Sequence, residues 1–200
     1  MPRLNEVSRA DVVSERVLET YQKHFGDRDP VKEPGTLSGT PGNWWTVFAL
    51  DEDLFTSMLD RHAWQFSTDR ELDPILRELA LARTGWVAGS SFVFSQHCKL
   101  LRRLGFDADK ISVIPAWSGA TCWSPVERLV LAYTDGLVAH GGRVPDHLFD
   151  ALRAEFSDVQ ILELTFMVTT YVQSSTICRA LRLEFDDRPD PVADLNPTAS

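Results

Sequence analysis

The strongest constraint on the fold of this chain is a series of helix start signals spread along its length. Asp73 stands directly before Pro74, and this pair is typical of a capping carboxylate followed by proline at the first helical position. Residues 124–127 (Ser-Pro-Val-Glu) and the pair Ser157 and Gln160 match the capping box, in which two side chains satisfy exposed backbone N–H groups. No segment shows the strict alternation of apolar and polar residues that indicates a strand. The sequence therefore predicts an all-α fold, a compact helical bundle.

The same signals divide the chain into about eight helices. We expect helices over about residues 9–24, 44–64 (one or two short helices), 74–86, 91–104, 107–114, 125–140, 145–156 and 157–182. Residues 27–43 are rich in proline and glycine and predict a long loop, whereas residues 186–200 predict a flexible polar tail. A length of 200 residues corresponds to one domain, which we expect to cover residues 1–185.

The charge balance argues against nucleic acid and membrane surfaces as partners. The chain has 29 acidic and 20 basic residues, for a net charge of -9, whereas a nucleic-acid-binding protein normally carries a basic stripe. No apolar run reaches the roughly 18 residues of a membrane-spanning helix, and the first residues lack the apolar segment of a signal peptide. Cys98, Cys122 and Cys178 are too widely spaced for a CxxC pair and do not predict a disulfide framework. We therefore expect a cytoplasmic protein.

The most informative stretch for function is ELALARTGWVAGSSFVFSQHCKLLRRLG, residues 78–105. Glu78 is a carboxylate on an otherwise apolar helix, and His97 shares a face of the next helix with Phe94 and Leu101. A buried imidazole needs a polar partner, and a carboxylate orients it and stabilises its cationic form. Glu78 and His97 are therefore predicted to form an acid–base pair. Their spacing along the chain does not by itself establish a contact.

This stretch resembles the carboxymuconolactone decarboxylase-like family, which includes the alkylhydroperoxidase D-like proteins. The redox branch of that family has a Glu, eleven residues, Cys, two residues, Cys, three residues and His. Here Glu78 and His97 match the Glu and the His, whereas Ser90 and Val93 occupy the cysteine positions. A second branch has a segment resembling Tyr-Glu-Trp-x-x-His, and residues 92–97 (Phe-Val-Phe-Ser-Gln-His) keep its aromatic pattern but replace its Glu with Val93.

The resemblance covers roughly residues 10 to 185 and includes the helices expected after residue 124. It implies the alkylhydroperoxidase D-like helical fold. Members of the family assemble through helix faces, so the resemblance also implies a homo-oligomer, either a dimer, a trimer or a hexamer.

The missing cysteines change the chemistry that the resemblance implies. Thiol peroxidase chemistry needs a nucleophilic thiolate and a resolving thiol, and the matching positions hold Ser90 and Val93 instead. Family members without these cysteines are associated with cofactor-independent chemistry on acidic lactones and ring-fission products of aromatic compounds. We therefore expect an acid–base enzyme acting on a small carboxylated lactone or unsaturated acid by decarboxylation, isomerisation or hydrolysis. His97 would move the proton and Glu78 would orient the imidazole.

Five further residues are candidates for binding that substrate. Ser90 and Tyr171 can donate hydrogen bonds, and Arg179, two helical turns after Tyr171, is expected to hold the substrate carboxylate. Trp86 and Trp117 are expected to line or rim the pocket. Four of them also have a purely structural interpretation: a helix cap for Ser90, and core packing for Tyr171 and the two tryptophans.

Two alternatives to this enzyme stay open. Glu78 could pair with a buried arginine such as Arg83 or Arg179, and His97 could be a satisfied core histidine, in which case the chain is an inert oligomeric binding member of the family. A second alternative is a peroxidase that uses Cys98, which is adjacent to His97. No HxxxH, CxxC or clustered His–Asp pattern predicts a metal site, and no glycine-rich phosphate loop predicts a nucleotide cofactor.

Overall fold

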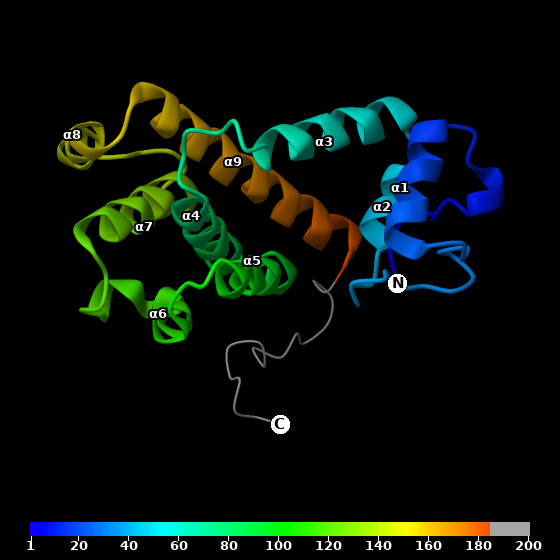
Figure 1. Cartoon of the computed structure of the whole chain (residues 1–200), viewed down its shortest axis with the longest axis horizontal. Helices are drawn as coiled ribbons and strands as arrows, with labels where there is room; N and C mark the ends of the chain where they lie inside the picture. Colours follow the sequence, from blue (N-terminus) through cyan, green and yellow to red (C-terminus); the bar gives the residue numbers. More distant parts are fainter. Residues whose placement is uncertain (185–200) are drawn as a thin grey trace. The chain divides into compact units, whose positions relative to one another are not determined.

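The computed structural model describes residues 1–184, and within this part of the chain every regular element is helical (Figure 1). The elements are η1 (Arg9–Asp11), α1 (Glu15–Phe25), α2 (Asn43–Phe48), α3 (Glu52–Gln65), α4 (Pro74–Val87), α5 (Ser91–Arg103), α6 (Ala108–Val113), η2 (Ile114–Gly119), α7 (Pro125–Val138), α8 (Asp146–Glu155) and α9 (Asp158–Leu181). The all-α prediction is confirmed, with nine α-helices in the described residues rather than about eight. The predicted tail, residues 186–200, lies outside the described residues.

The helix start signals act as the sequence predicted. The Asp73 carboxylate accepts the backbone N–H groups of Ile75 and Leu76, at 2.8 and 3.1 Å. Ser124 and Glu127 form the capping box of α7. The side chains and backbone N–H groups of Ser157 and Gln160 bond one another in the same way at the start of α9.

The first helix is shorter than predicted. Residues 9–11 make only a single 3-10 turn, and the chain is extended at Val12 before α1 begins at Glu15. The buried face of α1 starts at Val17 and includes Tyr21, so the residues before it have no apolar stripe to bury as a helix. The Tyr21 hydroxyl instead donates to the carbonyl of Val7, at 2.8 Å, and fixes this extended segment.

The described residues group into two compact units. The first comprises Met1–Thr68 and the end of α9 from Ile177 onward, and the second comprises Asp69–Thr176. This division follows contacts within the folded chain and not independent folding, so the single domain expected for residues 1–185 stays a prediction.

The first unit has an aromatic core. Its buried members are Val17, Tyr21, Phe25, Val47, Phe48, Ala49, Phe55, Met58, Cys178 and Leu183. Glu184 closes this unit onto α2, because its carboxylate accepts the backbone N–H groups of Gly42 and Trp44, at 3.2 and 2.8 Å. In return the side-chain oxygen of Asn43 accepts the N–H of Glu184 at 2.6 Å.

The second unit is built around α4, which lies beside α5 and α7 (Figure 1). The backbones of α4 and α5 approach closely at Gly85, where an added Cβ would lie 2.4 Å from the backbone nitrogen of Phe94 and 2.8 Å from its Cα. Only glycine leaves room for that approach. The core between these helices includes Leu79, Phe94 and Leu101.

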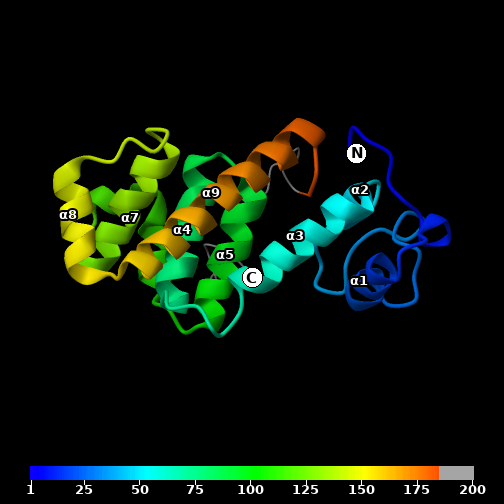
Figure 2. The ribbon, with the colours of Figure 1, turned by 90° about the horizontal axis from the view of Figure 1, so that it is seen from above.

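After α8 the chain turns back into α9, whose first part belongs to the same unit (Figure 2). The hydroxyls of Tyr133 on α7 and Thr165 on α9 lie 2.6 Å apart. The buried carboxylate of Glu163 accepts the N–H of Leu72 at 2.9 Å and a guanidinium N–H of Arg70 at 3.1 Å. These contacts fix α9 against α7 and against the segment that leads into α4.

We expect Gly85→Ala to lower the free energy of unfolding by about 1–3 kcal/mol, because the new methyl group forces α4 and α5 apart. Gly119→Ala is a matched control, since an added Cβ there meets no atom within 4 Å. Urea unfolding of both variants measures the difference. Equal stability of Gly85→Ala and the wild type would contradict the close approach.

Candidate functional site

α4 and α5 bring a carboxylate and an imidazole together inside the second unit. Oε2 of Glu78 lies 2.6 Å from Nδ1 of His97, and the two side chains are only 1% and 3% exposed. Ser90 caps α5 and Gly85 allows its close approach to α4, so local sequence features position both groups. The structure therefore shows the contact between Glu78 and His97 that their spacing along the chain could not establish.

Arg77 extends this pair to a chain of three polar groups. Its Nε–H donates a hydrogen bond to Oε1 of Glu78, at 2.8 Å, and its side chain is 11% exposed. Burial raises the pKa of the Glu78 carboxyl, but the hydrogen bonds and positive charge supplied by His97 and Arg77 outweigh burial and hold the pKa below its usual range. Glu78 is therefore a carboxylate at neutral pH.

Sequence reasoning missed Arg77 and named Arg83 or Arg179 as the arginine partner of Glu78. Neighbouring residues on a helix point about 100° apart, which argues against a contact between positions 77 and 78. The long arginine side chain overcomes that separation here. The signal that could have revealed it is the requirement that a buried carboxylate find a cation within reach.

Tyr171 reaches the same site from α9. Its ring centroid lies 4.5 Å from that of His97, and the two ring planes are nearly perpendicular at 82°. The structure thus brings together Glu78, His97 and Tyr171 among the residues that the sequence singled out. A hydrogen bond from Tyr171 to a substrate stays a prediction.

Ser90 and Trp86 lie at the turn between α4 and α5. The Ser90 side chain accepts the backbone N–H of Val93 at 3.3 Å, so its interpretation as a helix cap is confirmed. Trp86 is 43% exposed and its ring lies 5.3 Å from that of Phe94. Ser90 and Val93, at the two cysteine positions of the redox branch, therefore fall at the cap and in the first turn of α5.

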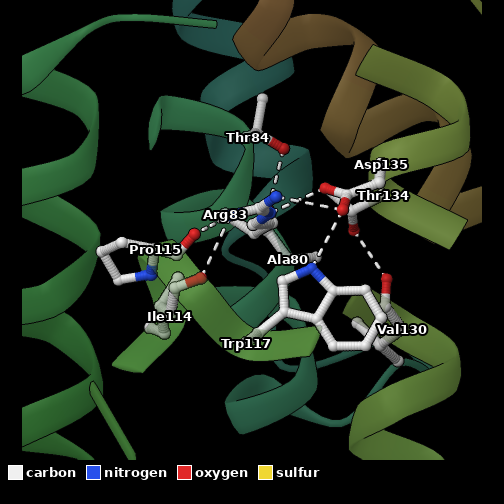
Figure 3. A network of polar contacts seen from close by, with 9 residues as sticks. All are labelled: Ala80, Arg83, Thr84, Ile114, Pro115, Trp117, Val130, Thr134 and Asp135. Atoms are coloured by element: carbon white, nitrogen blue, oxygen red, sulfur yellow. Dashed lines mark hydrogen bonds and ion pairs between the residues drawn. The ribbon is translucent and has the colours of Figure 1, made fainter. Parts of the chain in front are cut away.

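Arg83 holds a separate network (Figure 3). Its guanidinium donates to both carboxylate oxygens of Asp135, at 2.6 and 3.0 Å, and to the carbonyl oxygens of Ile114 and Pro115, at 3.1 and 2.9 Å. The indole N–H of Trp117 donates to the same carboxylate at 2.9 Å. Arg83 is thus a partner of Asp135 and anchors the 3-10 turn η2. The role of Trp117 as a pocket wall stays a prediction.

Arg179 and Cys98 are the remaining candidates that the sequence suggested. Arg179 is exposed and belongs to the first unit, whereas His97 belongs to the second. Its role in binding a substrate carboxylate stays a prediction. Cys98 is fully buried in the apolar core with Leu79 and Leu101, which is an environment that disfavours a reactive thiolate.

Residues 1–184 contain no group of three or more His, Cys, Asp and Glu side chains that could hold a metal ion. Among the same residues, no helix is long and apolar enough to cross a membrane.

The segment from Asp53 to Gly136, which contains both Glu78 and His97, matches the model of the carboxymuconolactone decarboxylase family. This match covers less than half of the chain, and over these residues the chain resembles that family. A curated relative, the uncharacterized protein YdfG of Bacillus subtilis (strain 168), is 23% identical over 105 residues, which are 52% of this chain and 71% of the relative.

Solved structures share the fold of this chain. A protein of unknown function from Agrobacterium tumefaciens, proposed to be the antioxidant defence protein AhpD, superposes with a TM-score of 0.62 and 23% identity, covering 68% of this chain and 92% of that one. The apo debrominase Bmp8 superposes with a TM-score of 0.71 and 14% identity, covering 95% and 94%. An uncharacterized peroxidase-related protein from Silicibacter sp. TM1040 superposes with a TM-score of 0.67 and 13% identity, covering 91% of this chain and 93% of that one. At these identities the likeness establishes the fold alone.

We expect Glu78→Gln to lower the free energy of unfolding by about 2–4 kcal/mol at neutral pH, because it removes the charge from a buried pair. Because the pKa of Glu78 is lowered in the folded protein, its carboxylate contributes fully to the free energy of unfolding above the ordinary glutamate pKa of about 4.3. This contribution is lost as the pH falls through the lowered pKa. The gap between the variant and the wild type should therefore narrow on acidification below pH ~4. Urea unfolding from pH 7 to 3 measures this difference in the free energy of unfolding, and Glu155→Gln, at an exposed position, is the control. A gap that stays constant with pH would contradict the assignment.

Proposed function

We propose that this protein is a cofactor-independent acid–base enzyme whose substrate is a small carboxylated lactone or unsaturated acid. The observation that carries the proposal is the buried contact of 2.6 Å between Nδ1 of His97 and Oε2 of Glu78. The reaction would be a decarboxylation, an isomerisation or a hydrolysis, in the breakdown of aromatic compounds. The family whose model residues 53–136 match takes its name from a decarboxylase of this substrate class.

The geometry supports a defined role for each nitrogen of His97. An ionised Glu78 accepts the Nδ1–H, which leaves Nε2 as the nitrogen that can exchange a proton with another molecule. For isomerisation or hydrolysis, Nε2 takes a proton from carbon or water next to the substrate carboxylate, and the resulting imidazolium is stabilised by Glu78. The imidazolium then returns the proton to the product, so His97 ends each cycle as it began. For decarboxylation, the C–C bond breaks to release CO2, and an imidazolium that has taken its proton from solvent delivers it to the carbanion left behind. A positioned base of this kind contributes about 10²–10⁴-fold to a rate.

The surroundings of the pair support this chemistry over thiol chemistry. Ser90 and Val93 stand where the redox branch has its two cysteines, and Ser90 is occupied in capping α5. Cys98, the cysteine next to His97, lies in the apolar core. A thiol peroxidase needs a thiolate that a peroxide can reach, and the positions around His97 do not offer one.

A second candidate function is binding of another protein without any catalytic activity. It is favoured by the burial of the pair, because Glu78 and His97 are almost fully enclosed and Tyr171 packs its ring against the imidazole. In this case the pair is a structural ion pair, and the helices present a surface to another protein.

A direct test distinguishes these two functions. We expect turnover or deuterium incorporation when the protein is mixed in D₂O with a panel of lactone acids and dienoic acids, observed by proton NMR. His97→Gln keeps a hydrogen-bond donor for Glu78 but cannot carry a proton, so it should lower the rate by about 10²-fold or more. The exposed His140→Gln is the matched control and should keep the wild-type rate.

The panel should also include halogenated pyrroles, because the related debrominase binds 2,3,4-tribromopyrrole. An unchanged rate in His97→Gln would remove His97 from the mechanism. Absence of any reaction with folded wild-type protein would favour binding without catalytic activity.

We also propose that the chain forms a homo-oligomer through α9. Val159, Leu162 and Phe166 recur at helical spacing on α9 and are 47%, 68% and 46% exposed. Glu163 is the single charged residue of the sequence between Asp158 and Arg179, and a face depleted of charge is typical of an interface core.

Light scattering should therefore give a mass that is a multiple of 22.5 kDa. Leu162→Glu should reduce that mass, because it places a charge in the proposed interface. Val31→Glu, at an exposed position of the first unit, should not. A monomeric wild type would contradict the proposal.

A further inference from the structure

We propose that Arg77 is the residue that sets the proton arrangement of this site: it holds Glu78 as a carboxylate and thereby keeps Nε2 of His97 available as a base. Arg77 itself is a positioning residue, because it acts through Glu78. The consequence for the rate rests on the proposed function, but the proton arrangement belongs to the resting protein and is measured there.

The two oxygens of Glu78 are divided between two partners. Oε1 accepts from Nε of Arg77 at 2.8 Å, and Oε2 lies 2.6 Å from Nδ1 of His97. The side chains of Arg77, Glu78 and His97 are 11%, 1% and 3% exposed. Water screens such charges weakly, so the guanidinium acts strongly on the carboxylate and on the imidazole beyond it.

The proton count shows what this charge does. With Glu78 ionised and His97 neutral, the pair carries one proton, on Nδ1, and has a net charge of minus one that Arg77 balances. A second proton produces either a carboxylate beside an imidazolium or a neutral carboxylic acid that donates to Nδ1. In both of these forms Nε2 carries a proton and is no longer a base. Arg77 favours the one-proton form, because only that form leaves the group of three without net charge.

Within residues 1–184, His97 and Arg77 are the groups whose hydrogen bonds and charge lower the pKa of the Glu78 carboxyl. Tyr171 on α9 contributes an aromatic ring. On α4 the next arginine is Arg83, which is held by Asp135 in its own network (Figure 3). Lys99 follows His97 by two positions on α5 and therefore points to another face of that helix. The arrangement thus depends on Arg77, whose contact with Glu78 the structure shows directly.

NMR of protein labelled with ¹⁵N-histidine tests this inference without a substrate. The His97 signals are assigned by their loss in His97→Gln. In the form in which the pair holds one proton, we expect the wild type to show that proton on Nδ1 and none on Nε2. In Arg77→Met the pH at which the pair takes up its second proton should rise by about one unit or more, because a neighbouring opposite charge shifts a carboxyl group by about 1–3 units.

Two matched variants separate charge from packing. Arg77→Lys restores the positive charge on a similar stem and should bring the midpoint back toward the wild-type value. Arg103→Gln removes the same charge from an exposed position on α5 and should shift the midpoint by less than about 0.3 unit, because water and salt screen it. If Arg77→Met does not fold, the comparison of Arg77→Lys with the wild type and the wild-type tautomer itself still test the inference.

The inference is overturned if the wild type carries its proton on Nε2, or if Arg77→Met titrates like the wild type. It is also overturned if Arg77→Met and Arg103→Gln shift the midpoint equally. Once a substrate is found, the acid limb of kcat/KM should move to higher pH in Arg77→Met by the same amount as the NMR midpoint. The expected NMR shift without turnover in any protein would uphold the role of Arg77 and contradict the proposed function.

Discussion

The close approach of α4 and α5 is the contact on which the second unit depends. Gly85 allows the two backbones to meet where any side chain would collide with Phe94, and this approach brings the imidazole of His97 within 2.6 Å of Glu78. Burial of a charged group is costly unless its partner and its hydrogen bonds are in place. The helix packing therefore supplies the geometry that makes a buried acid–base pair stable.

Buried and half-buried carboxylates elsewhere in this unit are handled in the same way. Asp135 binds Arg83, Glu163 binds Arg70, and Glu127 binds Lys110. Each of these contacts also fixes a backbone segment, as Arg83 does for η2. Two of the arginines nearest to the site in sequence, Arg77 and Arg83, are therefore engaged inside the protein.

The similarity to solved structures concerns the fold and not the reactive side chains. The fold is shared with a protein of unknown function proposed to serve antioxidant defence, a debrominase and a peroxidase-related protein at identities of 23% or less, and a shared fold does not by itself imply a shared reaction. In this chain the two positions that carry the thiols of the redox branch are Ser90 and Val93. The retained Glu78 and His97 are the groups to which the proposed chemistry belongs, and Arg77 is the neighbour that sets their charge.

The sequence by itself determined the helical class, most helix boundaries and the two members of the central pair. Caps such as Asp73 and Ser124 bond backbone groups only two or three residues away, so their effect can be predicted from neighbouring residues. The start of α1 was wrong by six residues because burial of Val17 and Tyr21, and not a local cap, decides where that helix begins. Only the tertiary structure decided that Glu78 pairs with Arg77, that Arg83 and Trp117 converge on Asp135, and that Tyr171 faces His97. Long side chains can reach several partners, and the packing of the helices selects among them.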